Sequence, residues 1–407
     1  GSVNTLSNVS FVKTTNNSRR IGGGSQYDTA SNVYRNRFAG GLFGYAYDVS
    51  INIDSSNSQG NISATSYIDY DNLQSYAGGL FGYAKLPTKE ANNHSLTIST
   101  ISEYPTDMVK FAKDREFADD TYSANIVSAD NAGGLIGALY SNGNVYGHIS
   151  DTPAITNDGT DLNKTLEDLK NLQVYSANIT RFTNKTLENQ LVTVRGSVNS
   201  SGIIASFEGM KNSTLILTNI KNNAKVVGTN NATNLSGASG IIGLIKAKSV
   251  YLDNCTNNAE INGNDFNYKY GNSTSAGGLI GVVNASTSSD LQYVEINGCK
   301  IDEYSLVTTG KTATDKVSAG GFIGHISDAD TTSNISLRIV ACSTVMRKDN
   351  SYGVVLTNNE QSITGAGGYI GSAEINRLII GSETSIQNSS MTNVKGTTNV
   401  GGIIGYC

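Results

Sequence analysis

The hydrophobic and polar positions of this chain follow one unit that recurs along most of its length. A typical copy has a small residue and one or two glycines, then two large apolar residues, then another small residue. The copies are AGGLFGYA at 39–46 and again at 77–84, AGGLIGAL at 132–139, SGIIASFE at 201–208, SGIIGLIK at 239–246, AGGLIGVV at 276–283, AGGFIGHI at 319–326, AGGYIGSA at 366–373 and VGGIIGYC at 400–407. The shorter spacings between successive copies cluster near 38 residues. Periods of this length indicate a solenoid, a propeller or another array of repeats.

Between the glycine motifs, apolar and polar residues alternate. The clearest alternating stretches are VSINID (49–54), SLTIST (95–100), TLILTN (214–219), SVYLDN (249–254), YVEING (293–298) and SLRIVA (336–341), with weaker ones at NAKVVG (223–228) and NAEING (258–263). An alternation of period two predicts strands that are buried on one face. The motif glycines are expected where one backbone stacks closely on another or turns sharply.

Two or three short strands per unit favour an all-β fold of the β-solenoid (β-helix) type, with about eight coils. One coil cannot bury its apolar face alone, whereas stacked coils bury a continuous core. A β-propeller is the alternative, because four strands also fit a unit of about 40 residues. Asparagine tolerates left-handed backbone angles, so Asn pairs are expected at corners of the coil, at 222–223, 257–258 and 358–359.

The spacing of the motifs also suggests a domain organisation. Residues 1–38 are interpreted as an N-terminal cap or a partial first coil, and residues 39–407 as the solenoid. The longest spacings place insertions at about 103–131 and 151–199, and each insertion contains a stretch with helical periodicity, at 106–120 and 158–172. Because the last motif ends at Cys407 in mid-repeat, we expect a fragment of a longer protein.

Charge and cysteine usage narrow the range of partners. The net charge is −5 and no long basic stretch occurs, which disfavours nucleic acid. No apolar run approaches the roughly 20 residues that cross a bilayer, so we expect no membrane insertion by this segment. Cys255, Cys299 and Cys342 end alternating stretches where other repeats have apolar residues, which predicts a stacked column of buried thiols. They lack CxxC-like spacing, so no metal and no other cofactor is expected.

The sequence contains no recognisable catalytic set. Its three histidines belong to no HExxH sequence: they are His94, His148 and His325. His325 occupies a motif position where other repeats have Tyr or Val, which is typical of a scaffold residue. Acidic pairs at 69 and 71 and at 328 and 330 are interpreted as solvated turn residues. We therefore predict that the chain is not an enzyme. The alternative, a polysaccharide-degrading β-helix enzyme, requires two carboxylates that converge in a groove.

Tyrosine is the residue type best suited to recognition here, since it combines a flat apolar ring with a hydroxyl group. The chain has 21 tyrosines and no tryptophan. Several tyrosines are expected on loops, in SYIDYDNLQSY (66–76) and DFNYKYGN (265–272), and these are the candidate binding residues: Tyr67, Tyr70, Tyr76, Tyr268 and Tyr270. The two insertions are further candidates, because variable loops on a rigid scaffold commonly carry binding function.

The recurring core Gly, then Leu, Ile, Phe or Tyr, then Ile or Phe, then Gly resembles the GLUG motif. It covers the chain from about Ala39 to Cys407. GLUG repeats belong to bacterial surface and secreted proteins, including adhesin-like proteins and the non-catalytic part of some immunoglobulin-A1 metallopeptidases. The resemblance implies an extracellular or bacterial cell-surface location. It also implies an adhesin-like rod that presents binding loops to a host-cell protein or glycan. The alternative that it implies is a non-catalytic region of a secreted protease that positions substrate. It supplies no functional residues.

Overall fold

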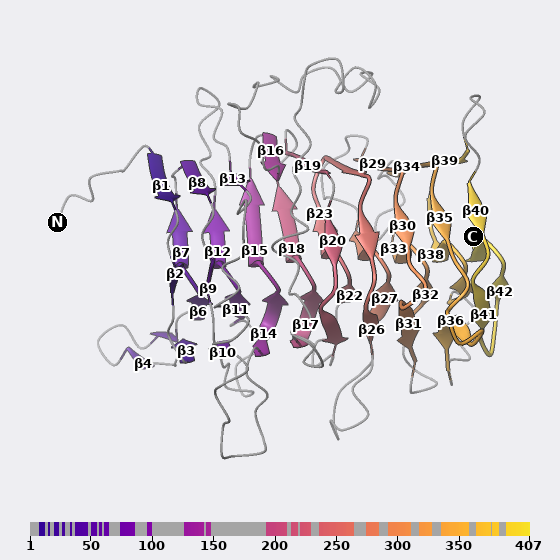
Figure 1. Cartoon of the computed structure of the whole chain (residues 1–407), viewed down its shortest axis with the longest axis horizontal. Coiled ribbons are helices and arrows are strands. Elements are labelled where there is room, and N and C mark those ends of the chain that lie inside the picture. The colour runs from indigo at the N-terminus through magenta and orange to yellow at the C-terminus, as the bar shows by residue number, and fades with distance from the viewer. Residues whose placement is uncertain are drawn as a thin grey trace.

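The computed structural model shows short β-strands stacked along one axis, with the N-terminus and the C-terminus at opposite ends of a rod (Figure 1). It describes residues 8–12, 15–16, 20–23, 27–28, 33–34, 37–47, 50–54, 57–58, 61–64, 74–85, 96–99, 126–141, 144–147, 193–209, 213–218, 220–228, 236–263, 274–284, 292–310, 317–327, 335–357, 364–375, 377–381 and 388–407. Within these ranges there is no helix, and the strands pair in parallel, apart from one short antiparallel pair. The predicted β-solenoid is confirmed. The propeller alternative is wrong, because propeller blades are antiparallel.

One complete coil, residues 237–262, shows the course of the chain. It contains five strands: β22 (Gly237–Ser239), β23 (Ile242–Lys246), β24 (Ser249–Asp253), β25 (Thr256–Asn257) and β26 (Glu260–Asn262). Each strand pairs in parallel with its counterpart in the next coil; β22 pairs with β27 and β23 with β28. A coil therefore has five strand positions, which we number first to fifth in chain order.

The first and second positions flank the glycine motif. The first position is occupied by β6 (Arg37–Gly40), β11 (Ser75–Gly78), the second halves of β14 (Ile126–Gly133) and β17 (Thr193–Ser201), β22, β27 (Ser275–Gly277), β32 (Ala319–Gly320), β37 (Ala366–Gly367) and β42 (Val400–Gly401). The second position forms a sheet of β7 (Phe43–Tyr47), β12 (Phe81–Lys85), β15 (Ile136–Ser141), β18 (Ile204–Gly209), β23, β28 (Ile280–Asn284), β33 (Ile323–Ser327), β38 (Ile370–Ala373) and β43 (Ile404–Tyr406).

The other three positions complete each coil. The third contains β1 (Asn8–Val12), β8 (Ser50–Asp54), β13 (Leu96–Ser99), β16 (Asn144–Gly147), β19 (Thr214–Thr218), β24, β29 (Gln292–Asn297), β34 (Ile335–Val340) and β39 (Arg377–Ile380). The fourth contains β2 (Thr15–Asn16), β9 (Asn57–Ser58), β20 (Lys221–Asn222), β25, β30 (Lys300–Ile301), β35 (Ser343–Thr344) and β40 (Ser389–Ser390). The fifth contains β3 (Arg20–Gly23), β10 (Asn61–Ala64), the first halves of β14 and β17, β21 (Lys225–Gly228), β26, β31 (Leu306–Thr309), β36 (Tyr352–Leu356) and β41 (Asn393–Lys395).

The N-terminal segment joins the same ladders. β1, β2 and β3 pair in parallel with β8, β9 and β10, and so occupy the third to fifth positions of a preceding coil. The short antiparallel pair consists of β4 (Tyr27–Asp28) and β5 (Val33–Tyr34).

The motif glycines are required by close backbone approach, as the pattern predicts. A Cβ atom on Gly281 would lie 2.5 Å from the carbonyl oxygen of Gly243 in the preceding coil and 2.7 Å from the Cα atom of Gly237. A Cβ atom on Gly278 would lie 2.1 Å from the carbonyl oxygen of Gly321 in the next coil. These distances are below any ordinary contact, and neither Gly278 nor Gly281 has a left-handed φ. The glycines therefore set how closely successive coils stack.

Two hydrophobic cores run along the rod. The larger core lies between the second and third strand positions and includes Leu279, Ile280 and Val283 from one coil. The smaller core lines the first and fifth positions, with an alanine column that includes Ala238, Ala276 and Ala319. Since each coil contributes the same inward positions, the cores continue from coil to coil, and this continuity is what makes a stack of thin coils stable.

The predicted column of buried thiols is confirmed. Cys255, Cys299 and Cys342 are unbridged, and their side chains are almost fully inaccessible to solvent. The backbone N–H of Cys255 donates to Sγ of Cys299 at 3.2 Å, and that of Cys299 donates to Sγ of Cys342 at 3.4 Å. Ile220 occupies the same corner of an earlier coil and is also buried. Burial raises the pKa of the Cys299 thiol well above its usual value. These cysteines act as core residues.

The Asn pairs at 222–223 and 257–258 lie where the chain turns from the fourth to the fifth strand position, as predicted, but none of these four residues has a left-handed φ. Asn222 and Asn257 lie in the fourth strand position with buried side chains, and Nδ2 of Asn222 donates to Oδ1 of Asn257 at 2.8 Å. Left-handed residues lie directly before the three cysteines, at Asn254, Gly298 and Ala341, and also at Gly310, Asn350, Gly381 and Asn399. Oδ1 of Asn222 also accepts from the backbone N–H of Ala224, so the same asparagine stabilises the turn and joins adjacent coils. The pair at 358–359 lies outside the described residues.

The expected insertions overlap the solenoid at their ends. Residues 126–131 of the first lie in β14, and residues 193–199 of the second lie in β17. β14 and β17 pair with each other, with one irregularity between Ala129 and Asn131. The stretches with helical periodicity, 106–120 and 158–172, lie outside the described residues.

Candidate functional site

The candidate tyrosines of the sequence analysis have different outcomes. Tyr67, Tyr70, Tyr268 and Tyr270 lie outside the described residues. Tyr76 lies in β11, the first strand position of its coil, and is half-buried. Its ring stacks on Phe38 with a centroid distance of 5.6 Å, and its hydroxyl donates to Oε1 of Gln74 at 3.0 Å. Tyr76 is thus part of a larger aromatic surface, which sequence reasoning missed.

That surface extends over the coils of β7, β12 and β15, at the N-terminal part of the rod. We call it the tyrosine platform and define it by the following residues: Phe38, Tyr45, Tyr47, Tyr76, Tyr83, Lys85 and Tyr140. Tyr45 and Tyr47 are 47% and 53% exposed. Tyr83 makes edge contacts with Phe38 and Tyr76. The glycine motif places these residues, because its fixed register aligns Tyr45 with Tyr83 and Tyr47 with Lys85.

The surroundings of the platform raise the pKa of several of its tyrosines, among them Tyr45, Tyr83 and Tyr140. Burial, and after it the charge of Glu208, raises the pKa of Tyr83 to about 12. The same two causes raise the pKa of Tyr140. Burial is also the first cause of the raised pKa of Tyr45. At physiological pH Tyr45, Tyr83 and Tyr140 therefore keep their protons, and each hydroxyl can both donate and accept a hydrogen bond.

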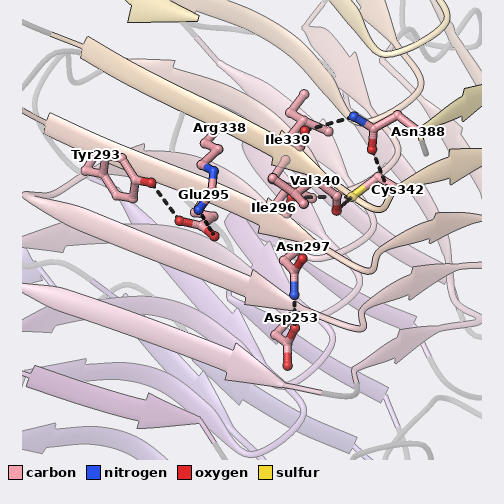
Figure 2. Close-up of polar contacts among 10 residues, drawn as sticks. All are labelled: Asp253, Tyr293, Glu295, Ile296, Asn297, Arg338, Ile339, Val340, Cys342 and Asn388. Atoms are coloured by element: carbon pink, nitrogen blue, oxygen red, sulfur yellow. Dashed lines mark hydrogen bonds and ion pairs between the residues drawn. The ribbon is translucent and has the colours of Figure 1, made fainter. Parts of the chain in front are cut away.

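A cluster of hydrogen-bonded polar side chains lies at the third strand position, on the face that points away from the core (Figure 2). Glu295 is almost completely buried there. Tyr293 donates its hydroxyl to one carboxylate oxygen of Glu295 at 2.6 Å, and Nη1 of Arg338 in the next coil lies 3.3 Å from the other oxygen. On the same face, Nδ2 of Asn297 donates to Oδ1 of Asp253 at 2.7 Å.

This polar group connects neighbouring coils. Both carboxylate oxygens of Glu295 have partners, and Arg338 comes from the following coil, so Glu295 bridges two coils. Burial, and then the hydrogen bond to Glu295, raises the pKa of Tyr293. At the corner of the next coil, Asn388 accepts from the backbone N–H of Cys342 and donates to the carbonyl of Ile339, and so continues the column of cysteines (Figure 2). The arrangement stabilises the stack.

His325 lies inside the rod, between the first and second strand positions. Its Nδ1 lies 2.5 Å from Oγ of Ser372, which is itself 2.7 Å from Oγ of Ser318. Burial lowers the pKa of His325 to about 4. The imidazole is therefore neutral at physiological pH, and its position agrees with the scaffold role expected from the sequence.

The remaining sequence candidates lie outside the described residues: His94, His148, and the acidic pairs at 69 and 71 and at 328 and 330. Where the structure is described, no three His, Cys, Asp or Glu side chains gather as metal ligands. The same part of the chain contains no helix long and apolar enough to span a bilayer.

Comparison of the chain with protein-family models, with curated proteins and with solved structures finds no match. The resemblance to GLUG repeats therefore depends on the motif itself.

Proposed function

We propose that this chain is a non-enzymatic, adhesin-like segment of a bacterial surface or secreted protein. Its stacked coils form a stiff rod, and the long segments that connect β13 to β14 and β16 to β17 present binding surfaces to a host-cell protein or glycan outside the cell. A substrate-positioning region of a secreted protease is the alternative, and it would use the same rod.

The observation that carries this proposal is the continuity of the ladder across the long segments. β14 pairs with β17, and β17 pairs onward with β21 and β22, although residues 148–192 intervene between β16 and β17. In the following coil the chain also passes from the third to the fifth strand position, from β19 to β21, but it needs only residues 219–224. The extra residues are thus additions to a step that needs no more than a short connection, as expected of segments displayed from a scaffold.

Because the connections from β16 to β17 and from β19 to β21 join equivalent strand positions, the longer one can be replaced by the shorter one. Gly147 is in register with Leu217, and Thr193 with Lys225. Residues 149–192 can therefore be replaced by the sequence of residues 219–224 without breaking either strand. We expect this chimera to keep the β-type circular dichroism spectrum of the parent, because both flanking strands are retained. We expect it to lose binding to a glycan array and to epithelial cells.

The outcomes separate the candidate functions. Loss of binding in a folded chimera supports display by residues 149–192. Binding that persists in the chimera places recognition elsewhere on the chain. Absence of binding by the parent itself contradicts an adhesive role and favours a spacer or the protease-associated alternative, which co-purification with a metallopeptidase domain would reveal.

A further inference from the structure

We infer that the tyrosine platform is a carbohydrate-binding surface that takes a neutral, extended hexose glycan lying along the rod axis. This inference rests on the proposed adhesive function and names a ligand class and a site for it. The platform lies on the strands of the rod itself, whereas the sequence predicted candidate binding residues on loops and insertions.

The first support is an outward ladder with one residue from each of four successive coils. Tyr47, Lys85, Tyr140 and Glu208 are in direct register in the second sheet. Neighbouring strands lie about 4.8 Å apart, which is close to the length of one sugar unit in an extended glycan. A linear polymer of sugars can therefore meet one ladder residue with each successive unit.

The second support is the geometry of the rings and of the lysine between them. The ammonium group of Lys85 lies 5.5 Å from the ring centroid of Tyr47 and 5.1 Å from that of Tyr140. The rings of Tyr45 and Tyr47 are nearly parallel, with an interplanar angle of 7°. The cation–π contacts and the packed rings hold these side chains in place before a ligand arrives, so binding costs little conformational entropy.

The third support is the balance of hydrogen-bonding groups. Lys85 offers donors, the exposed Glu208 offers acceptors, and the phenol groups offer both. Sugar hydroxyls are themselves donors and acceptors, while the apolar face of a sugar ring suits an aromatic ring. The opposite charges of Lys85 and Glu208 match a neutral glycan better than an anionic one.

The structure also disfavours an extended peptide as the occupant. β12 is already paired with β7 on one side and with β15 on the other. An added β-strand could pair only with β7, which is the terminal strand of this sheet in the described part of the chain, and Tyr47 is the one ladder residue that β7 carries. A peptide that contacts all four ladder residues would have to bind through side chains. A peptide partner is an outcome that the experiment below distinguishes.

The test is calorimetric titration of the full chain with two neutral probes, cellohexaose and a hexasaccharide of N-acetyllactosamine units, and with one acidic probe, a hexamer of galacturonic acid. We expect saturable binding of at least one neutral probe and weaker binding of the acidic one. Tyr47→Ala is expected to weaken the neutral interaction about tenfold, since an exposed aromatic anchor is lost. Glu208→Gln is expected to strengthen binding of the acidic hexamer.

The chain offers a matched control at a distant coil. The ammonium group of Lys348 lies 5.4 Å from the ring centroid of Tyr304, which is 51% exposed. This pair reproduces the Lys–Tyr contact of the platform, so Tyr304→Ala tests the loss of an exposed ring as such. It is expected to leave binding unchanged. Unchanged melting curves of Tyr47→Ala and Tyr304→Ala would show that both variants fold.

The inference is overturned if neither neutral probe binds, or if Tyr47→Ala binds as tightly as the parent. Its failure is distinguishable from that of the proposed function. Adhesion to cells without binding of either neutral probe contradicts the platform and leaves the adhesive role intact, with a protein or peptide as the partner. Glycan binding that Tyr47→Ala weakens, without adhesion to cells, supports the platform and contradicts the adhesive role.

Discussion

The N-terminal coils and the central coils of the rod share one backbone but differ at one column of side chains. This column lies in the second strand position, two residues after the second large apolar residue of the glycine motif. In the N-terminal coils it holds Tyr45 and Tyr83, and in the central coils it holds Val282 and His325. The tyrosines gather with Phe38 in a partly exposed aromatic cluster. Val282 and His325 are sealed inside the rod.

The difference shows that coil geometry and surface chemistry are specified by separate positions. Glycines at the motif fix the distance between coils in both regions, since a Cβ atom on Gly82 or Gly281 would meet the backbone of the preceding coil at 2.5 Å. The column beside them can then change from aromatic to aliphatic or polar without moving the strands. A repeat protein can therefore place a recognition surface on some coils and a closed wall on others.

The largest expected effect comes from breaking the backbone spacing that both regions share. Gly281→Val should destabilise the chain by at least about 4 kcal/mol or prevent folding, because the new side chain would overlap backbone atoms that cannot move aside. Chemical denaturation followed by circular dichroism measures this effect. Gly402→Val is the control, since a Cβ atom on Gly402 would meet nothing within 4 Å. Equal melting of Gly281→Val and the parent would contradict the stacking role of the motif.

A smaller effect is expected at His325 in the central coils, where the free energy of unfolding should depend on pH. The folded state disfavours protonated His325, whose pKa is lowered from 6.5 to about 4. As the pH falls below about 6.5, the unfolded chain binds the proton first, so the free energy of unfolding declines until about pH 4 and then levels. This loss amounts to at most about 3 kcal/mol.

The matched variant is His325→Val, because Val282 is its register partner and is fully buried. The stability of the variant should decline less between pH 6.5 and pH 4 than that of the parent. Denaturant titrations at several pH values provide the measurement. If the free energy of unfolding declined equally with falling pH in the two proteins, the pKa of His325 would not be lowered in the folded state.

The smallest expected effect concerns the aromatic region. Tyr83→Val makes its coil resemble the central coils and removes ring contacts with Phe38, Tyr45 and Tyr76. The cost should be about 1–2 kcal/mol, because the site is only partly buried. The pH profile between 4 and 6.5 should stay that of the parent, which thermal melts at both pH values would show. A loss as large as that of Gly281→Val would mean that the aromatic cluster, too, fixes the backbone.

Much of the solenoid can be predicted from the sequence because each coil repeats the same local requirements. The glycine motif, the alternating stretch around Val250 and the cysteine corner at Cys255 each reappear at the expected place. The tyrosine platform could not be predicted in this way. Tyr47, Lys85 and Tyr140 belong to three different coils, and only the register of β7, β12 and β15 brings them together. The signal that the sequence does contain is the equivalent position of Tyr45 and Tyr83 in two successive copies of the motif.

The sequence by itself determined that this protein is built from repeated units of short strands, because the small motif glycines and the period-two alternation are local properties of the chain. The tertiary structure decided that these strands pair in parallel between stacked coils. Only the tertiary structure decided which side chains become neighbours across coils. It joined the buried corner residues Asn222 and Asn257 of adjacent coils by a hydrogen bond, and it paired Glu295 with Arg338. The physical reason is the register of the sheets: contacts between coils depend on alignment over dozens of residues, and the length of the intervening segments does not determine that alignment.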